Sequence, residues 1–477
     1  MPPRPEFRPA AVHAELGSDL FDVVAAAEFP RHELRYRNLA WAARVGLDTL
    51  DEAEWIAHFG RFEPLPGSFE APLALRYHGH QFRTYNPELG DGRGFLFAQM
   101  HDLADNRLLD FGTKGSGTTP WSRGGDGRLT LKGGVREVLA TSMLEALGVN
   151  TSKSFSLIET GEQLTRGDEP SPTRSAVLVR LSHSHIRIGS FQRLSFLQDT
   201  AGLQRLLDHS IRHYMPEVWN DDLAARATGF LAEVTARVAR TGGQWMAAGF
   251  VHGVLNTDNI NISGESFDYG PWRFLPTNDP EFTAAYFDET GLYAYGRQPE
   301  TLLWNLARLA GCLLAFADKP SLEAALAPFW GMMQTSFVAT IIRRLGLQSQ
   351  SLQRDAELAR ALHSFLFESQ APFEQTMFDW FGGLASEGRA TSGPNAAHYD
   401  HPSFAAVRVA LQGYTANPAL PVGHRYFTRA TPATLLIDEV EALWAPIAEN
   451  DDWSKFNAKL ADIAELAEAT GNAPAGA

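Results

Sequence analysis

The sequence predicts an α+β fold with two lobes, a mixed α/β N-terminal lobe and a mainly helical C-terminal lobe. The chain has 477 residues, which is long for one compact core. A glycine loop, a strand-like run, a polar turn and a second strand-like run follow one another between residues 90 and 114. Beyond about residue 185 the chain is predominantly helical in pattern. We therefore expect one lobe over residues 1–185 and a second over residues 186–477.

The elements of the N-terminal lobe are clearest around its glycine loops. Residues 1–75 mix short amphipathic segments with Pro and Gly, and we assign them no chemistry. Strands are expected at 95–100 and 108–114, because both are short apolar runs bounded by turn residues. A helix is expected over 132–147, where apolar residues recur at helical spacing, and Gly148 would end it.

The second lobe follows a buried strand at 175–180 and consists of a series of helices. One helix, over 228–247, ends just before a polar loop that starts at His252. Small polar residues over 470–477 predict a disordered tail. The remaining helices are expected at 301–317, 322–344, 355–367 and 432–469.

The composition narrows the classes of protein to consider. With 44% apolar and 20% charged residues, the chain resembles ordinary soluble globular proteins. Its net charge of −15 argues against a nucleic-acid or anionic-membrane partner, since neutralising phosphates requires surplus Lys and Arg. The single cysteine, Cys312, indicates a reducing compartment. We see no signal peptide and no apolar run of membrane-spanning length, so we expect a cytoplasmic protein.

The most informative motif is the loop from His252 to Asn259, His-Gly-Val-Leu-Asn-Thr-Asp-Asn, which is followed by Asp268-Tyr-Gly. It resembles the catalytic loop and metal-binding triplet of protein kinases, in which His-Arg-Asp-x-x-x-x-Asn supplies an Asp to accept the proton of the substrate hydroxyl. Aligning His252 and Asn259 to that spacing puts Val254 where this Asp belongs. We therefore expect a protein-kinase-like fold that lacks the usual base for phosphoryl transfer.

Three residues of this motif carry candidate chemistry. Asn259 offers an amide oxygen and Asp268 a carboxylate, the kinds of ligand that Mg²⁺ and Mn²⁺ prefer. Because Val254 cannot take a proton, Asp258 is the candidate general base, and His252 is expected to hold the loop. In the alternative interpretation, Asp258 and Asn259 form an Asx turn and Asp268 caps a helix.

A Lys and a Glu upstream suggest a second part of the same site. Lys114 closes a predicted strand and Glu137 lies inside the helix that follows, which matches the ion pair that positions nucleotide phosphates in kinases. The alternative is a solvent-facing Lys and a surface Glu. The neighbouring Arg136 could equally be the residue that turns inward.

The glycine loops can bring backbone N–H groups close to phosphate oxygens. The first contains Gly90 and Gly92 with Arg93 as a possible charged contact, and the second contains Asp126 and Gly127. Neither has the spacing of a dinucleotide fingerprint or of a Walker A loop, so each is weak evidence by itself.

Two arginines and several histidines complete the candidates. Arg180 and Arg187 are seven residues apart and could clamp a polyphosphate. The His-x-His pairs, which begin at His78 and His183, lack the further nearby ligands that a zinc site needs. We interpret these histidines as structural.

Several motifs, in the same order, resemble those of the selenoprotein O family. They cover about residues 35–315 and the chain more loosely beyond. The matching segments are Tyr77-His-Gly-His-Gln-Phe82, Leu89-Gly-Asp-Gly-Arg93, Lys114-Gly-Ser-Gly-Thr-Thr-Pro-Trp-Ser-Arg123, Gly125-Asp-Gly-Arg128, Ser184-His-Ile-Arg-Ile-Gly189, the His252–Asn259 loop, Phe267-Asp-Tyr-Gly-Pro271, and Gln298-Pro with Leu303-Trp-Asn-Leu-Ala-Arg308.

The resemblance implies a kinase-like fold that binds ATP in an inverted orientation and transfers AMP to Ser, Thr or Tyr hydroxyls of proteins; transfer of UMP from UTP is also implied. Asp258 would then be the base, and Asn259 and Asp268 would bind Mg²⁺ or Mn²⁺. Glu137 would orient Lys114. The nucleotide would be held by Gly90, Gly92, Arg93, Lys114, Asp126, Gly127, Arg180, Arg187 and Asp268.

Two other functions stay open at the level of sequence. One is a conventional protein kinase with Asp258 as a displaced base, and the other is a non-catalytic, ATP-binding pseudokinase scaffold. The chain also departs from the resemblance at its end, because family members often close with a Cys or selenocysteine and residues 471–477 contain neither. We therefore expect no redox switch of that kind.

Overall fold

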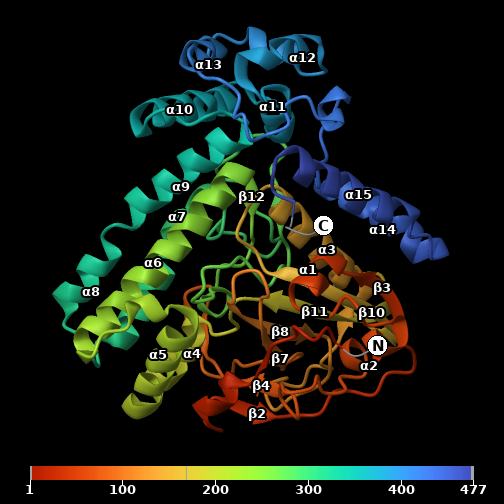
Figure 1. Cartoon of the computed structure of the whole chain (residues 1–477), viewed down its shortest axis with the longest axis vertical. Helices are drawn as coiled ribbons and strands as arrows, with labels where there is room; N and C mark the ends of the chain where they lie inside the picture. The colour runs from red at the N-terminus through yellow and green to blue at the C-terminus, as the bar shows by residue number, and fades with distance from the viewer. Residues whose placement is uncertain (1–2, 168, 474–477) are drawn as a thin grey trace.

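The computed structural model describes residues 3–167 and 169–473. Its N-terminal region is rich in strands and its C-terminal region is helical, so the protein is a mixed α/β structure. Figure 1 shows the strands at one end of the molecule and α10 (Leu352–Ser369), α11 (Phe373–Asp379) and α13 (Phe404–Leu411) at the other.

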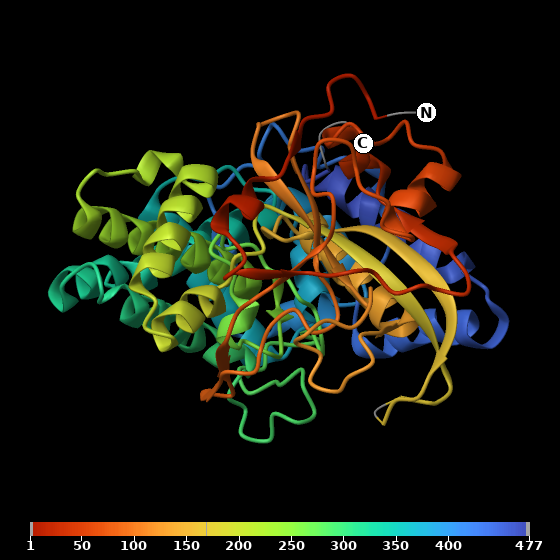
Figure 2. The same cartoon turned by 90° about the horizontal axis from the view of Figure 1, so that it is seen from below.

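The main sheet has nine strands, and every pairing in it is antiparallel. Its strands are β1 (Pro9–Ala10), β2 (Phe21–Val23), β3 (Glu33–Arg37), β4 (Leu73–Leu75), β7 (Leu96–His101), β8 (Leu108–Lys114), β9 (Leu129–Thr130), β10 (Lys153–Leu164) and β11 (Thr173–Ser182). They lie in the order β2-β4-β7-β8-β11-β10-β3, with β1 beside β7 and β9 beside β11. In Figure 2 the long strands β10 and β11, in yellow, curve along this sheet.

Short helices and small sheets surround the main sheet. The helices here are α1 (Leu39–Arg44), α2 (Glu52–Phe59) and α3 (Leu131–Ala146), and the small sheets pair β5 (Gly79–Gln81) with β6 (Thr84–Asn86) and β12 (Phe250–Val251) with β13 (Arg273–Phe274). Helix α3 starts where the Thr130 hydroxyl accepts a hydrogen bond from the Gly133 N–H, and it packs on β10 and β11.

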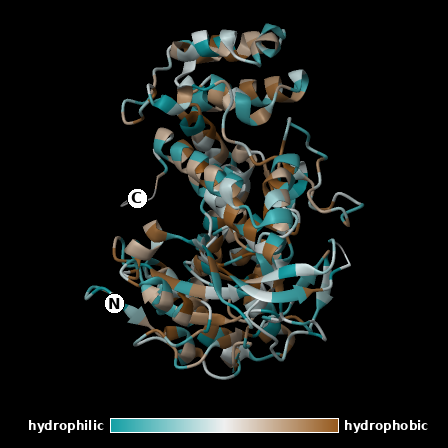
Figure 3. Ribbon diagram, turned by 90° about the vertical axis from the view of Figure 1, so that its right-hand side faces the viewer, coloured by the Kyte–Doolittle hydropathy of each residue, from teal (hydrophilic) through white to brown (hydrophobic). Residues whose placement is uncertain are grey.

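The helical region begins six residues after β11. Its remaining helices are α4 (Ile188–Phe196), α5 (Thr200–Tyr214), α6 (Leu223–Ala248), α7 (Gln298–Leu313), α8 (Lys319–Leu326), α9 (Phe329–Arg344), α12 (Glu387–Ser392), α14 (Ile437–Asn450) and α15 (Ser454–Ala469). Helices α14 and α15 return to the sheet end and pack on α3 (Figure 1). In Figure 3 the helices carry hydrophobic and hydrophilic residues on different faces, and the largest apolar core runs from Leu16 to Ala469 through both regions.

Most of the predicted elements are confirmed, with two corrections. The strand at 108–114 is β8, and the helix expected at 132–147 is α3. The helix expected over 322–344 is instead two helices, because Pro328 cannot continue a helical hydrogen-bond ladder and α9 starts after it. The helix expected over 432–469 is also divided, at Asp451, which adopts a left-handed φ of 54°.

Two further expectations concern the membrane and the tail. By length and composition, residues Lys319–Arg344 could cross a membrane, with a mean hydropathy of 1.3, although 39% of that window is buried and the stretch comprises α8 and α9. Residues 474–477 of the predicted disordered tail lie outside the described residues. Its beginning is ordered instead, since Thr470 and Asn472 both donate hydrogen bonds to the carbonyl of Ala146.

Candidate active site

The predicted site residues converge on one cleft of about 640 Å³, formed by the glycine loops and the His252–Asn259 loop. The predicted residues that line this cleft are Gly90, Gly92, Arg93, Asp126, Gly127, Asp258, Asn259 and Asp268. The other four, Lys114, Glu137, Arg180 and Arg187, are buried. Lys114 and Arg180 pair with Asp268, Arg187 donates to the Asp258 carbonyl, and Glu137 pairs with Lys114.

Lys114 and Arg180 reach the cleft from neighbouring strands. In the register of β8 and β11, Lys114 lies opposite Leu178 and Arg180 opposite Gly112. Both side chains therefore project from the same face of the sheet, because opposed residues share a face and positions two apart repeat it. Gly112 is required here, since a Cβ at this position would lie 2.0 Å from Nε2 of His185. The strand pairing thus places two cations side by side.

Asp268 is the acid that these two cations share. Its Oδ1 lies 3.1 Å from Nζ of Lys114 and 2.9 Å from Nη1 of Arg180. Burial alone would raise the pKa of Asp268, but Lys114, Arg180 and Arg187 hold that pKa well below its usual range. Asp268 also has a left-handed φ of 63°, a conformation that Asp tolerates better than most residues. The neighbouring cations therefore favour the ionised form of this carboxylate at the cleft wall.

Glu137 gives Lys114 a second acidic partner. The Glu137 carboxylate accepts a hydrogen bond from Nζ of Lys114 through Oε1, and this ion pair joins α3 to the end of β8. Glu137 is 1% exposed, and its Oε2 has no hydrogen-bond partner among the described residues. The structure thus contains the Lys114–Glu137 ion pair that the sequence predicts. Arg136, the alternative candidate, instead donates to the carbonyl of Trp272.

The loop that carries Asp258 and Asn259 presents two different groups to the cleft. Oδ1 of Asp258 is buried without a hydrogen-bond partner among the described residues, and burial raises the pKa of Asp258 to about 6 although Arg187 lowers it. The amide nitrogen of Asn259 donates to the Val254 carbonyl, which leaves the amide oxygen on the opposite side of the group. An unpaired carboxylate oxygen beside an amide oxygen is a donor set that suits a divalent cation or an incoming hydroxyl.

His252 lies behind this loop. It is fully buried, its Nε2 is 2.9 Å from the Phe267 carbonyl, and its backbone N–H donates to Gln298. Burial lowers the pKa of His252, so the ring is neutral and connects the loop to the residue that precedes Asp268. This geometry agrees with a supporting role for His252.

Arg187 connects the first glycine loop with the His252–Asn259 loop. Its guanidinium contacts Oδ1 of Asp91 at 3.2 Å and the carbonyl of Asp258 at 3.4 Å, and it lies over the ring of Tyr77. Neither Arg187 nor Arg180 lines the 640 Å³ cleft, but Arg180 pairs with Asp268 and Arg187 donates to the Asp258 carbonyl, and both of these residues line it. Asp91 was not among the predicted site residues, although it stands inside the Gly90–Gly94 loop.

The glycine loops fit closely against their surroundings. A Cβ on Gly90 would lie 2.4 Å from the ring of Trp121, and Gly127 has a φ of 68° with Gly117 pressed against it. Asp126 is exposed at the cleft mouth and forms an ion pair with Arg166 at 2.8 Å. The loops therefore bring backbone close to the cleft at positions where a side chain would not fit.

Three cations at the cleft were missed by sequence reasoning. Arg123, Arg128 and Arg166 line it, and Arg166 also lines an adjoining cleft of about 420 Å³ together with Arg93 and Lys114. Arg123 and Arg128 each close one of the motifs quoted above and could have been found there. Arg166 lies in no motif, and only the fold brings it to Asp126.

The histidines of the His-x-His pairs are held by hydrogen bonds, in agreement with their structural interpretation. Nδ1 of His183 lies 2.8 Å from the Leu108 carbonyl, and Nδ1 of His78 lies 2.9 Å from the Tyr85 hydroxyl.

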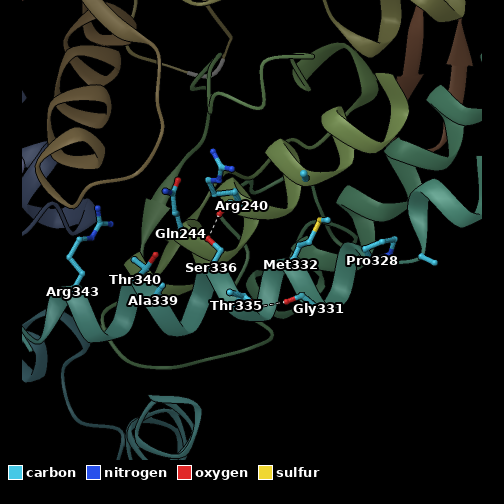
Figure 4. Close-up of a pocket in the computed structure, with 12 residues that line it drawn as sticks. Arg240, Gln244, Pro328, Gly331, Met332, Thr335, Ser336, Ala339, Thr340 and Arg343 are labelled. Carbon is cyan, nitrogen blue, oxygen red and sulfur yellow. Dashed lines mark hydrogen bonds between the residues drawn. The ribbon is translucent and has the colours of Figure 1, made fainter. Parts of the chain in front are cut away.

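A larger groove, of about 910 Å³, lies between α6 and α9 and is chemically different (Figure 4). Its charged residues are Arg240 and Arg343, and no Asp, Glu or His is among the residues that line it. Figure 4 shows the Ser336 hydroxyl bonded to the Arg240 carbonyl across the two helices. Because this groove lacks a base and a metal ligand, we place the candidate active site in the smaller cleft.

Comparisons with known proteins point to one family. Residues 5–464 match the family model described as protein adenylyltransferase SelO. The chain is 46% identical over 464 residues to the protein nucleotidyltransferase YdiU of Gloeobacter violaceus, covering 94% of this chain and 93% of that protein. It is 44% identical over 457 residues to the protein nucleotidyltransferase YdiU of Trichormus variabilis, covering 92% of each.

Proposed function

The chain belongs to the SelO family of protein adenylyltransferases, and we propose from this that it transfers AMP from ATP to Ser, Thr or Tyr hydroxyls of other proteins and releases pyrophosphate. One observation carries the proposal. Val254 occupies the position of the kinase base, while Asp258, four residues later, lies in the cleft with an unpaired carboxylate oxygen. The site thus keeps the metal-binding pattern of a kinase but presents its base at another place.

We also propose that the fold is protein-kinase-like, with lobes at 1–185 and 186–477. The Lys114–Glu137 ion pair between a strand and the following helix supports this assignment, as does the helical region that follows the sheet. ATP would bind in the inverted orientation that the family resemblance implies. Lys114, Arg180 and Arg187, which are the deeply buried cations of the site, would then neutralise the terminal phosphates.

The residues present fit a divalent cation. Asp268 is ionised and Asn259 offers an amide oxygen, so these two would hold Mg²⁺ or Mn²⁺. When bound, the ion would neutralise phosphate charge and help to orient the triphosphate.

The transfer step follows from the remaining residues. Oδ1 of Asp258 would accept the proton of the acceptor hydroxyl, whose oxygen forms a bond to the α-phosphorus. The bond between the α-phosphorus and the oxygen that bridges to the β-phosphorus breaks, and pyrophosphate leaves with that electron pair. Arg93, together with the glycine-loop backbone at Gly90 and Gly92, would bind the phosphates during this step. Asp126 and Gly127 would border the nucleotide at the cleft mouth.

Label position distinguishes the candidate reactions. With Mg²⁺ or Mn²⁺ present, the protein and an acceptor mixture are incubated with ATP labelled at the α- or the γ-phosphate, and modified peptides are analysed by mass spectrometry. We expect α-label on protein as an adenylyl group and no γ-label. Transfer of γ-label would identify a kinase, whereas ATP binding without transfer of either label would identify a non-catalytic scaffold. Parallel reactions with UTP test for UMP transfer.

A further inference from the structure

A group of imidazoles and one carboxylate lies away from the proposed active site, where α5 meets the short 3₁₀ helix η1 (Val12–Leu16). His209 and His213 stand one turn apart on the same face of α5, and Glu15 faces them from η1. One ligand atom from each of these three residues lies within 4.8 Å of the others. None of the three lines the 640 Å³ cleft.

The distances within this group approach those of a metal site. Nε2 of His213 and Oε2 of Glu15 are 3.6 Å apart, and the ring centroids of His209 and His213 are 4.5 Å apart. Ligand atoms around a tetrahedral Zn²⁺ are about 3.4 Å from one another, as bond lengths near 2.1 Å require. The Glu15 side chain is 65% exposed, so it has room to move by the small distance that remains.

Unpaired nitrogen atoms are the independent observation that points to a ligand. His209 is 7% exposed, and its Nε2 has no hydrogen-bond partner among the described residues. Nδ1 of His13, which is 3% exposed on η1, is likewise unpaired, and the His13 and His209 rings lie 6.0 Å apart. A buried polar atom without a partner costs free energy, so such atoms in a native protein usually meet a ligand, an ion or a water molecule.

The donor set of the cluster also favours a metal over an anion. It combines two imidazoles and one carboxylate, which is typical of Zn²⁺ and related transition metals.

We propose that His209, His213 and Glu15 form a binding site for a transition-metal ion of the Zn²⁺ class, with water completing the coordination. The site is separate from the Mg²⁺ or Mn²⁺ position proposed at Asp268. The site joins η1, in the N-terminal segment, to α5 in the helical region. Helix η1 also contacts the sheet, where the His13 N–H donates a hydrogen bond to Gln99. A bound ion therefore fastens η1 to α5.

The test titrates ZnCl₂, without nucleotide, into the full-length protein after metal removal, and follows binding by calorimetry. We expect one tight site in the native protein and in Asp268→Asn, which changes the proposed nucleotide metal site and its ion pairs with Lys114 and Arg180 but no residue of this cluster. Binding should be at least about tenfold weaker in Glu15→Gln and lost in the double variant His209→Gln, His213→Gln. His363→Gln is the matched control, because His363 is also a partly buried helical histidine and lies on α10.

Additional measurements keep the result interpretable. X-ray absorption of the zinc-loaded protein should show imidazole ligands, and zinc should raise the midpoint of thermal unfolding in the native protein but not in the double variant. If the double variant fails to fold, the zinc affinity of Glu15→Gln tests the proposal instead, because the Glu15 side chain is mostly exposed to solvent and its replacement should not prevent folding. The proposal is overturned if the native protein takes up no zinc, if binding is unchanged in the histidine variant or in Glu15→Gln, or if it disappears with Asp268→Asn.

Discussion

Replacing Glu137 by Gln tests whether the negative charge of Glu137 is needed to balance Lys114 beside the proposed nucleotide cleft. The substitution preserves the shape of the side chain and removes the negative charge that faces Lys114. In the native protein Lys114 has two acidic neighbours, Glu137 and Asp268, and Asp268 is also shared with Arg180. After the change, two buried cations compete for one carboxylate.

The expected magnitude follows from burial and the remaining partner. The Lys114 and Glu137 side chains are 7% and 1% exposed, and removing one partner from a buried ion pair costs about 3–5 kcal/mol. Here Asp268 remains 3.1 Å from Nζ of Lys114, and the Gln amide still accepts a hydrogen bond. We therefore expect the free energy of unfolding to fall by about 1–2 kcal/mol. A comparable loss at the transition state would lower kcat/KM about 5- to 30-fold.

The assay measures transfer of α-labelled ATP to protein over a range of ATP concentrations, together with urea unfolding. Glu145→Gln is the matched control, because Glu145 lies on the same helix and pairs with Lys153 at 3.1 Å without lining the cleft. We expect Glu145→Gln to retain kcat/KM within about twofold. Native kcat/KM in a folded Glu137→Gln variant would refute the reasoning.

Three further substitutions test other parts of the molecule. Asp258→Asn should keep ATP affinity near the native value while the transfer rate, measured in single turnovers, falls roughly 100-fold; an undiminished rate would remove Asp258 as the base. Asp268→Ala should abolish metal-dependent ATP binding in calorimetry and transfer together, and retention of either would contradict its assignment. Glu159→Gln tests acid stability. Burial would raise the pKa of Glu159, but hydrogen bonds from Arg174 and Arg35 lower it below its ordinary value of 4.5. The ionised Glu159 carboxylate therefore contributes fully to the free energy of unfolding above pH 4.5, and this contribution disappears as pH falls through the lowered pKa. Urea unfolding should show the variant to be less stable than the native protein by about 1–2 kcal/mol at pH 7, and this difference should vanish in acid. A difference independent of pH would exclude the charge as its cause.

Local patterns in the sequence were sufficient for the longer elements. The strand at 108–114 and the helix at 132–147 were predicted because each has a clear hydrophobic period and a turn or stop signal at its end. The short strands β2 and β3 were not predicted, since three to five residues carry little periodicity and their pairing is set by β4 and β10. Pro328 could have been recognised in the sequence as a helix break, but the apolar residues on both sides of it favoured one continuous helix.

By itself, the sequence identified most of the chemical groups of the candidate site, because the motif spacing from Lys114 to Asp268 predicts an amide, several acids and several cations in a kinase-like order. Apart from the Lys114–Glu137 ion pair, which the sequence predicts, tertiary structure alone decided how these groups are paired. Arg180 shares Asp268 with Lys114 because two antiparallel strands are in one register, and Arg166 reaches Asp126 across 40 residues of chain. Contacts between distant segments depend on how strands and loops pack in space, and no local period in the amino-acid order encodes them.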